Sequence, residues 1–187
     1  LKFEELFYIQ LQILRQMKRR EQNSGFIMPI VGKAFHAFYQ TCLPFPLTNA
    51  QKRVVREIQA DIKSGKQMNR LLQGDVGSGK TIVALLTALL AVDNGYQACI
   101  MAPTEILAVQ HYETLTEYLA PFGIKVALLT GGMRVKERRS LLMDLELGLI
   151  DVLVGTHALL QDDVKFARLS VVVTDEQHRF GVEQRAK

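Results

Sequence analysis

The stretch Gly74–Thr81, which reads G-D-V-G-S-G-K-T, decides the fold of this chain. It fits the phosphate-binding pattern G-x-x-x-x-G-K-[ST], known as the P-loop. The partly apolar residues before it predict a short buried strand over 70–74. Ile82–Val92, apolar at every position except Thr87, predicts a buried helix after it. A strand, a glycine-rich turn and a helix in this order form the context that the pattern requires.

The residue types of this stretch suit a bound nucleoside triphosphate. Its glycines let the backbone fold tightly, so that successive N–H groups turn inward around a phosphate at the positive end of the next helix. Lys80 adds a charge that reaches the β- and γ-phosphates, and the Thr81 hydroxyl is a hard oxygen ligand for Mg²⁺. The residues expected to contact the nucleotide here are Gly74, Gly77, Ser78, Gly79, Lys80 and Thr81.

Composition places the chain among globular α/β proteins. It has 187 residues, 48% of them hydrophobic and 22% charged, which suits one domain with a small appendage. A net charge of +4 permits a polyanionic partner without requiring one. Cys42 and Cys99 are far apart and lack metal spacing, which indicates a reduced, intracellular protein. No signal peptide or membrane span is predicted, and a start at Leu1 suggests a piece of a larger protein.

The order of predicted helices and strands indicates an α/β fold. Several strands are apolar at consecutive positions, as in 98–101 and 171–173, which is typical of a parallel sheet covered by helices on both faces. We expect residues 1–42 to form a helical extension and residues 43–187 to form the main domain. Helices are predicted over 2–20, 31–41, 47–63, 80–93, 104–120 and 134–147. Strands are predicted over 70–74, 97–102, 125–130, 151–155 and 170–175.

A second nucleotide signal follows the last predicted strand, which ends in Asp175-Glu176-Gln177-His178. A P-loop hydrolase needs carboxylates there, one to hold Mg²⁺ and one to polarise the attacking water. Two acids after a strand are also common as a helix N-cap. The combination with the P-loop, with several β-α units between the two motifs, favours the hydrolase reading.

With these motifs the chain resembles a known family. The stretches Leu71–Thr81, Ala102–Ala108, Gly155–Leu159 and Asp175–Arg185 are similar to the first motor domain of superfamily 2 helicases, in particular bacterial ATP-dependent DNA helicases that act on branched DNA. The resemblance covers roughly residues 43–187, and the N-terminal helix resembles the segment that precedes the motor. It implies a RecA-like domain that uses ATP and Mg²⁺ to move on DNA in recombination and repair. Transcription-repair coupling translocases share much of this set and remain the alternative parent.

The resemblance also assigns roles at the nucleotide. Phe45, Thr48 and Gln51 correspond to an adenine-recognising segment, in which the Gln51 amide reads the base and Phe45 stacks on it. Without the family, a core phenylalanine and a surface glutamine would be the simpler reading. The catalytic set is Lys80, Asp175, Glu176 and His178, and Mg²⁺ is assigned to Thr81 and Asp175.

Three further motifs resemble the DNA-backbone contacts of these motors. Each follows a predicted strand, where hydroxyls and backbone amides suit contacts to phosphate, although an N-cap or a tight turn would look the same. Gly132 and Met133 depart from the residues usual in the family. The basic residues of 134–139 indicate either a solvated helix face or a DNA contact. The DNA-contact residues implied are Pro103, Thr104, Thr130, Gly131, Thr156 and His157.

The resemblance also implies partners beyond this stretch. These are branched DNA, a second motor domain that supplies an arginine finger, and a wedge domain, in a protein of the bacterial cytoplasm with no membrane contact. On its own, the chain is expected to bind Mg-ATP weakly and to hydrolyse it poorly. A nucleotide-responsive binding module without turnover is therefore the second reading. A GTPase or a small-molecule kinase is disfavoured because the chain lacks the guanine motif N-K-x-D.

Overall fold

The computed structural model describes residues 2–21, 24–75 and 77–175. Its helices alternate with strands from α4 onward, while the segment before α4 is helical and irregular. Within the described residues, no helix is long and apolar enough to cross a membrane. The α-helices are α1 (Lys2–Glu21), α2 (Lys33–Ala37), α3 (Asn49–Lys63), α4 (Lys80–Asp93), α5 (Glu105–Leu119) and α6 (Val135–Glu146). Shorter helical turns are η1 (Phe38–Cys42), η2 (Ala120–Phe122) and η3 (His157–Leu160).

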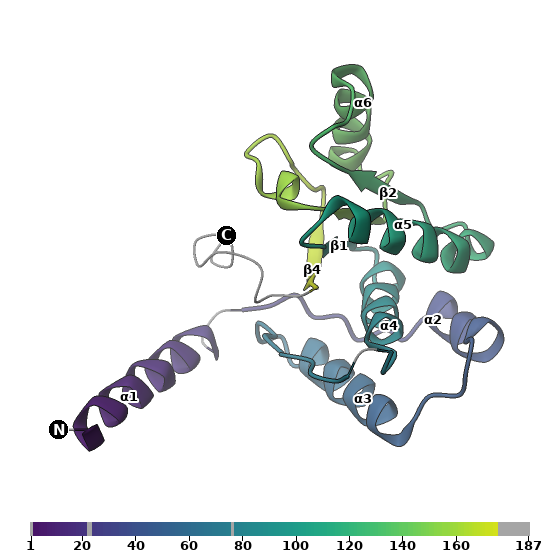
Figure 1. Cartoon of the computed structure of the whole chain (residues 1–187). Coiled ribbons are helices and arrows are strands. Elements are labelled where there is room, and N and C mark those ends of the chain that lie inside the picture. The colour runs from purple at the N-terminus through teal and green to yellow at the C-terminus, as the bar shows by residue number, and fades with distance from the viewer. Residues whose placement is uncertain (1, 22–23, 76, 176–187) are drawn as a thin grey trace.

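Four parallel strands form the sheet at the centre of the domain (Figure 1). Their order across the sheet is β2-β3-β1-β4, so β1 is an inner strand with a partner on each side. All pairings are parallel, as expected for strands joined by helical crossovers. The strands are β1 (Gln97–Met101), β2 (Val126–Leu129), β3 (Val152–Gly155) and β4 (Leu169–Thr174).

Alternate side chains of β1 enter two separate hydrophobic cores. Ala98 and Ile100 pack in the core that holds α3, α4 and α5, whereas Cys99 and Met101 pack against α6 and η3. All five residues of β1 are buried. Burial of the Cys99 thiol raises its pKa to about 12. Helices thus cover both faces of the sheet, which confirms the predicted α/β sandwich.

The N-terminal extension has two parts with different surroundings. Helix α1 projects away from the sheet (Figure 1), and its Phe3 and Leu6 side chains are exposed. The following segment instead joins the main core, where Met28 and Phe38 are buried together with residues of α4. The division of the chain at residues 42 and 43 remains a prediction.

A carboxylate at the end of α4 fastens the extension to the domain. The two oxygens of Asp93 accept hydrogen bonds from the backbone N–H groups of Gly32, Ala34 and Phe35, at 3.0 to 3.1 Å. A Cβ on Gly32 would lie 2.6 Å from the Asp93 carboxyl carbon, so only glycine fits this approach. Asp93 therefore caps the N-terminus of α2 from another helix.

The strand predicted over 70–74 was wrong. Residues 67–75, which the structure describes, form no strand; the segment begins with an isolated bridge between Lys66 and Ser24. Arg70 is paired with Glu57 and Asp61 of α3, which draws the segment toward that helix. Leu71 is 69% exposed, and the apolar pattern therefore did not reflect burial on both faces.

The remaining predicted helices and strands are confirmed within a few residues. Thr48 caps α3, because its hydroxyl accepts a hydrogen bond from the Gln51 N–H while the Gln51 Oε1 accepts one from the Thr48 N–H. The predicted helix 31–41 is split into α2 and the turn η1.

We expect Asp93→Ala to lower the free energy of unfolding by about 2 kcal/mol, because three backbone N–H groups lose a charged acceptor. Urea unfolding followed by circular dichroism measures this change. The matched control is Asp162→Ala at an exposed position, which should stay within about 0.5 kcal/mol of the unmodified protein. Equal stability of the two variants would show that water replaces the carboxylate without cost.

Candidate nucleotide and DNA site

The strand register brings the predicted motifs to one edge of the sheet. Met101 is the Cα partner of both Gly155 and Thr174, so β1, β3 and β4 end at the same level. Leu129 at the end of β2 is in turn paired with Gly155. Because parallel strands present their ligands at their carboxyl ends, this edge is the candidate site. The predicted site residues that follow directly are Pro103, Thr104, Thr130, Gly131, Thr156, His157 and Asp175.

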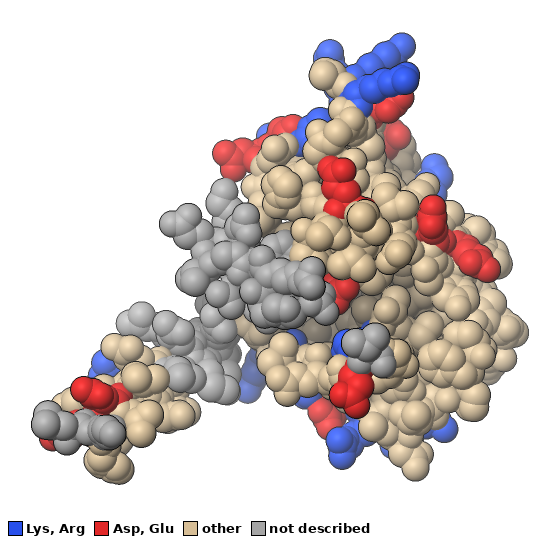
Figure 2. All heavy atoms as spheres, viewed as in Figure 1, with Lys and Arg blue, Asp and Glu red and all other residues tan. Residues whose placement is uncertain are grey.

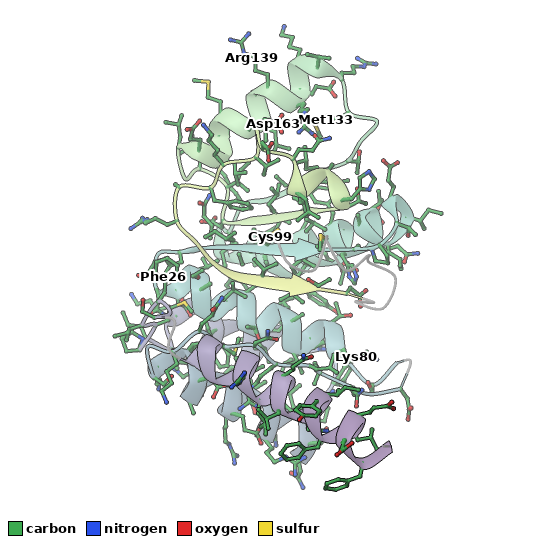
Figure 3. The ribbon with its side chains drawn as sticks, turned by 90° about the vertical axis from the view of Figure 1, so that its left-hand side faces the viewer. Phe26, Lys80, Cys99, Met133, Arg139 and Asp163 are labelled. Atoms are coloured by element: carbon green, nitrogen blue, oxygen red, sulfur yellow. The ribbon has the colours of Figure 1, made fainter. Side chains whose placement is uncertain are left out.

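The P-loop lies at the same end of the sheet. Helix α4 leads into β1 through a short turn at 94–96, so it runs back along the sheet and its N-terminus lies near the carboxyl ends of the strands. Figure 3 shows Lys80 on the side toward which β4 points. The loop and the carboxylate Asp175, far apart in the sequence, thus face one region.

The backbone of the loop takes the left-handed conformation that its glycines permit. Gly77 and Gly79 have φ angles of 78° and 75°. The Ser78 N–H donates to the Asp75 carbonyl at 3.1 Å, which closes the turn. A Cβ on Gly74 would lie 2.6 Å from the Ser78 hydroxyl. Val76, in the middle of the loop, lies outside the described residues.

The Lys80 ammonium is held inside the loop. Its Nζ donates to the carbonyls of Gly74 and Asp75 at 2.6 and 2.8 Å. Thr81, the next residue, lies in the first turn of α4 and is half-buried. The lysine therefore stands at the centre of the turn where the sequence predicts the phosphates.

Gln51 connects the upstream segment to the P-loop. Its Oε1 accepts from the Thr48 N–H, and its Nε2 donates to the Ser78 carbonyl at 2.8 Å. A Cβ on Gly79 would lie 2.5 Å from Gln51 Nε2 and 3.1 Å from Phe45 Cζ. The sequence predicted contact with adenine but did not predict that the Gln51 amide holds the loop itself.

An open hollow lies beside Phe45, with a volume of about 380 Å³. Phe45 is 41% exposed, so part of its ring is free to stack on a planar group. The residues that line the hollow are Tyr39, Leu43, Pro44, Phe45, Pro46, Leu47 and Lys52. Tyr39 and Lys52 were not singled out by sequence reasoning.

Asp175 lies directly after β4 and is held by two bonds. Its N–H donates to the Met101 carbonyl at 2.8 Å, and its Oδ2 lies 2.8 Å from Nε2 of His111 on α5. His111 carries no motif signal, and the sequence analysis missed it. The other predicted residues of this motif, Glu176, Gln177 and His178, lie outside the described residues.

The donors at this edge fit a magnesium ion that is held mainly by phosphate and water. Mg²⁺ in nucleotide sites uses one or two protein oxygens and keeps several waters. Asp175 offers a half-buried carboxylate, of which His111 engages only Oδ2, and Thr81 offers a hydroxyl. Among residues 2–21, 24–75 and 77–175, no three His, Cys, Asp or Glu side chains gather as a metal cage.

The predicted DNA-contact residues differ in exposure. Thr104 is exposed and caps α5, its hydroxyl accepting from the Leu107 N–H at 3.3 Å. The Thr156 side chain is only 1% exposed, and its hydroxyl has no hydrogen-bond partner among the described residues. His157 beside it is exposed. Thr156 thus supports this edge from below, while Thr104 and His157 lie on its surface.

Glu105 joins two of these motifs, a link that the sequence analysis did not identify. Its Oε1 accepts a hydrogen bond from the Gly131 N–H at 3.2 Å. This bond ties the start of α5 to the turn after β2. The two motifs are therefore in direct contact.

The basic cluster after Met133 is only partly available to a partner. Arg138 forms a two-pronged ion pair with Asp163, at 2.8 and 2.9 Å, and its side chain is 19% exposed. Arg134, Lys136 and Arg139 remain exposed. Figure 2 shows the group of Lys and Arg side chains that protrudes at the α6 end of the molecule.

The parallel sheet and the glycine-rich turn before α4 define a domain of the P-loop class. Residues 48–187 match the DEAD/DEAH box helicase family. The match spans most of the chain, and the chain therefore belongs to that family. The resemblance to superfamily 2 helicases drawn from the motifs is confirmed.

Individual relatives are similar over nearly the whole chain. It is 53% identical over 182 residues to the ATP-dependent DNA helicase RecG of Bacillus subtilis, covering 97% of this chain and 26% of that protein. It is 51% identical to RecG of Thermotoga maritima, covering 99% of this chain and 24% of the relative. The chain thus spans about a quarter of the length of the curated relatives that it matches.

Solved structures agree with this assignment. RecG bound to a three-way DNA junction superposes with a TM-score of 0.88 at 50% identity, covering 96% of this chain and 24% of that one. A hypothetical ATP-dependent RNA helicase from Sulfolobus tokodaii superposes with a TM-score of 0.58 at 20% identity, covering 78% of this chain and 41% of that one. The second likeness shows the fold alone.

We expect Gly79→Ala to weaken ATP binding by about tenfold or more, because the new Cβ strains a positive φ and also displaces Gln51 and Phe45. Calorimetric titration with Mg-ATP measures this loss. Gly95→Ala is the matched control, since Gly95 has the same φ of 75° but no atom within 4 Å of an added Cβ. Equal ATP affinity in the two variants would contradict a role for the close contact at Gly79.

Proposed function

We propose that this chain is the ATP-binding motor domain of an ATP-dependent DNA helicase that translocates on branched DNA and remodels it. The observation that carries the proposal is the single sheet edge to which the register brings the predicted nucleotide and DNA motifs. The similarity to RecG over 97% of the chain supports the choice of substrate. A RecG structure holds a three-way DNA junction, and we extend that substrate class to this protein.

The adenine base is assigned to the hollow beside Phe45. The Phe45 ring stacks on the base, Thr48 fixes the orientation of Gln51, and the Gln51 amide donates and accepts at the adenine edge. In the structure this amide bonds to the Ser78 carbonyl, so contact with adenine requires it to share or exchange that bond. Base recognition and the shape of the P-loop are thereby coupled.

The triphosphate is assigned to the P-loop, where Gly74, Gly77, Ser78 and Gly79 supply backbone N–H groups. Lys80 exchanges its two carbonyl partners for phosphate oxygens, a charge-assisted contact. Thr81 and Asp175 hold Mg²⁺, which when bound neutralises charge on the phosphates. Glu176 and His178 complete the catalytic set, with Glu176 orienting the attacking water.

DNA is assigned to the exposed rim of the same edge, chiefly through backbone phosphates. Thr104 offers a hydroxyl at a helix N-terminus, and Pro103, Thr130 and Gly131 shape the adjoining turns. His157 forms the third contact at the surface, and the buried Thr156 supports the turn that presents it. Such contacts ignore base sequence, as a translocating motor requires.

The other domains that the proposed activity requires belong to a larger protein that includes this domain. They are a second motor domain with an arginine finger and a wedge domain that engages branched DNA, in the bacterial cytoplasm. Without them the chain binds Mg-ATP weakly and turns it over slowly. A transcription-repair coupling translocase is the alternative parent, and a nucleotide-binding module without turnover is the alternative activity.

The test is ATP hydrolysis by the full-length protein that contains this chain, measured without DNA, with linear duplex and with a model fork. We expect the fork to stimulate hydrolysis most. Lys80→Ala should lower stimulated turnover by about a hundredfold, because the charge on the transferring phosphate is lost. The exposed Lys165→Ala is the control and should retain full activity. Equal turnover with fork and duplex would refute the preference for branched DNA, and full activity of Lys80→Ala would refute the site.

A second test separates the two contacts assigned to Gln51. We expect Gln51→Leu to weaken ATP binding by about fivefold and to weaken binding of inorganic tripolyphosphate less, because only ATP carries the base that the amide reads. Competition against a fluorescent nucleotide measures both affinities. Gln59→Leu, on the same helix, is the control. Equal losses for the two ligands would leave Gln51 with a role in the P-loop alone.

A further inference from the structure

His111 lies at the site, although no sequence motif includes it. It lies in the second turn of α5, and its Nε2 is 2.8 Å from Oδ2 of Asp175, which follows β4. The two residues are 64 positions apart in the sequence. Their side chains are 16% and 33% exposed, so the contact is partly shielded from water.

The chemistry of the pair fixes the direction of the bond. An ionised carboxylate has acceptor sites only, so the imidazole must carry a hydrogen on Nε2 and donate it. This donation engages one carboxylate oxygen of Asp175 and leaves Oδ1 for another ligand. A carboxylate held in this way presents its second oxygen in a fixed direction.

The backbone alone does not orient the Asp175 side chain. Its N–H is fixed to the Met101 carbonyl by sheet-like pairing, but the carboxylate can still rotate about two single bonds. The bond from His111 removes this freedom. Partners that orient a metal-binding carboxylate in this manner commonly raise metal affinity or activity by tenfold or more.

We propose that His111 is a positioning residue that holds the Asp175 carboxylate in the orientation that Mg²⁺ requires. The inference rests on the proposed function, which assigns Mg²⁺ to Asp175. It adds a residue of α5 to a site otherwise built from the P-loop and the end of β4. His111 acts through Asp175 and contacts neither the nucleotide nor the metal.

The test is the magnesium requirement of nucleotide binding by the full-length protein. The affinity for a fluorescent ATP analogue is measured over a series of Mg²⁺ concentrations and again with the metal chelated. We expect His111→Asn to raise, by about fivefold, the Mg²⁺ concentration that gives half of the gain in nucleotide affinity, because the shorter amide does not reach Asp175. Nucleotide affinity in the absence of metal should stay unchanged.

Two matched variants separate positioning from packing. His111→Gln should need the same Mg²⁺ concentration as the unmodified protein, since the glutamine amide nitrogen reaches the position of Nε2. The glutamine and asparagine side chains differ by one methylene. Gln110→Leu, at the adjacent exposed position of α5, should behave as the unmodified protein. In an Asp175→Asn background, His111→Asn should cause no further shift, because its effect passes through that carboxylate.

The outcomes distinguish this inference from the proposed function. If the unmodified protein shows Mg²⁺-dependent binding and the Asn and Gln variants of His111 behave alike, the positioning role is overturned and the proposed function stands. A further shift in the Asp175→Asn background would also overturn it. If the unmodified protein binds nucleotide without any need for Mg²⁺, the assigned metal site fails and this inference fails with it.

Discussion

Parallel pairing in register around β1 is the constraint on which the rest of the site depends. Because Met101 lies opposite both Gly155 and Thr174, three strands end at one level, and the residues after them share an edge. A slip of one residue would turn Cys99 and Ile100 to the wrong cores, since they pack on opposite faces. The hydrophobic pattern of the strands thus fixes where the polar residues of the site lie, before any of those residues makes a contact.

A second constraint joins the nucleotide segments to each other. The Gln51 amide of helix α3 and the Phe45 ring of the segment before it both lie against Gly79 of the P-loop. A side chain at position 79 would collide with these groups and would strain the positive φ. Glycine at this position therefore permits both the tight turn and the contact with Gln51. Under the proposed function, the residues assigned to the base and to the phosphates are therefore packed against each other.

The sequence predicted most of the fold because its signals were local. Helix α3 has its cap at Thr48, and β1 is apolar at consecutive positions. The strand predicted over 70–74 was wrong because Leu71 is exposed rather than buried, and the adjacent Arg70 is paired with Glu57 and Asp61 of α3, a contact that the local pattern does not reveal. In the site, spacing predicted the P-loop residues, and the resemblance assigned the adenine segment and the DNA-contact residues. The contacts of His111 and Glu105 could not be predicted, because their partners lie 64 and 26 positions away and are brought close only by the packing of α5 on the sheet.

Helix α5 gives these distant contacts a common mechanical basis. Thr104 is the N-cap of this helix. Glu105 accepts a hydrogen bond from the turn after β2, and His111 contacts Asp175. Glu105 and His111 are six residues apart, or about 9 Å along the axis of one continuous helix. Both contacts are thus made by one continuous helix. Under the proposed function the N-terminus of α5 lies at the DNA and His111 lies at the metal-binding carboxylate. On that proposal, α5 would connect the DNA contact with the nucleotide site by a path that does not pass through the P-loop.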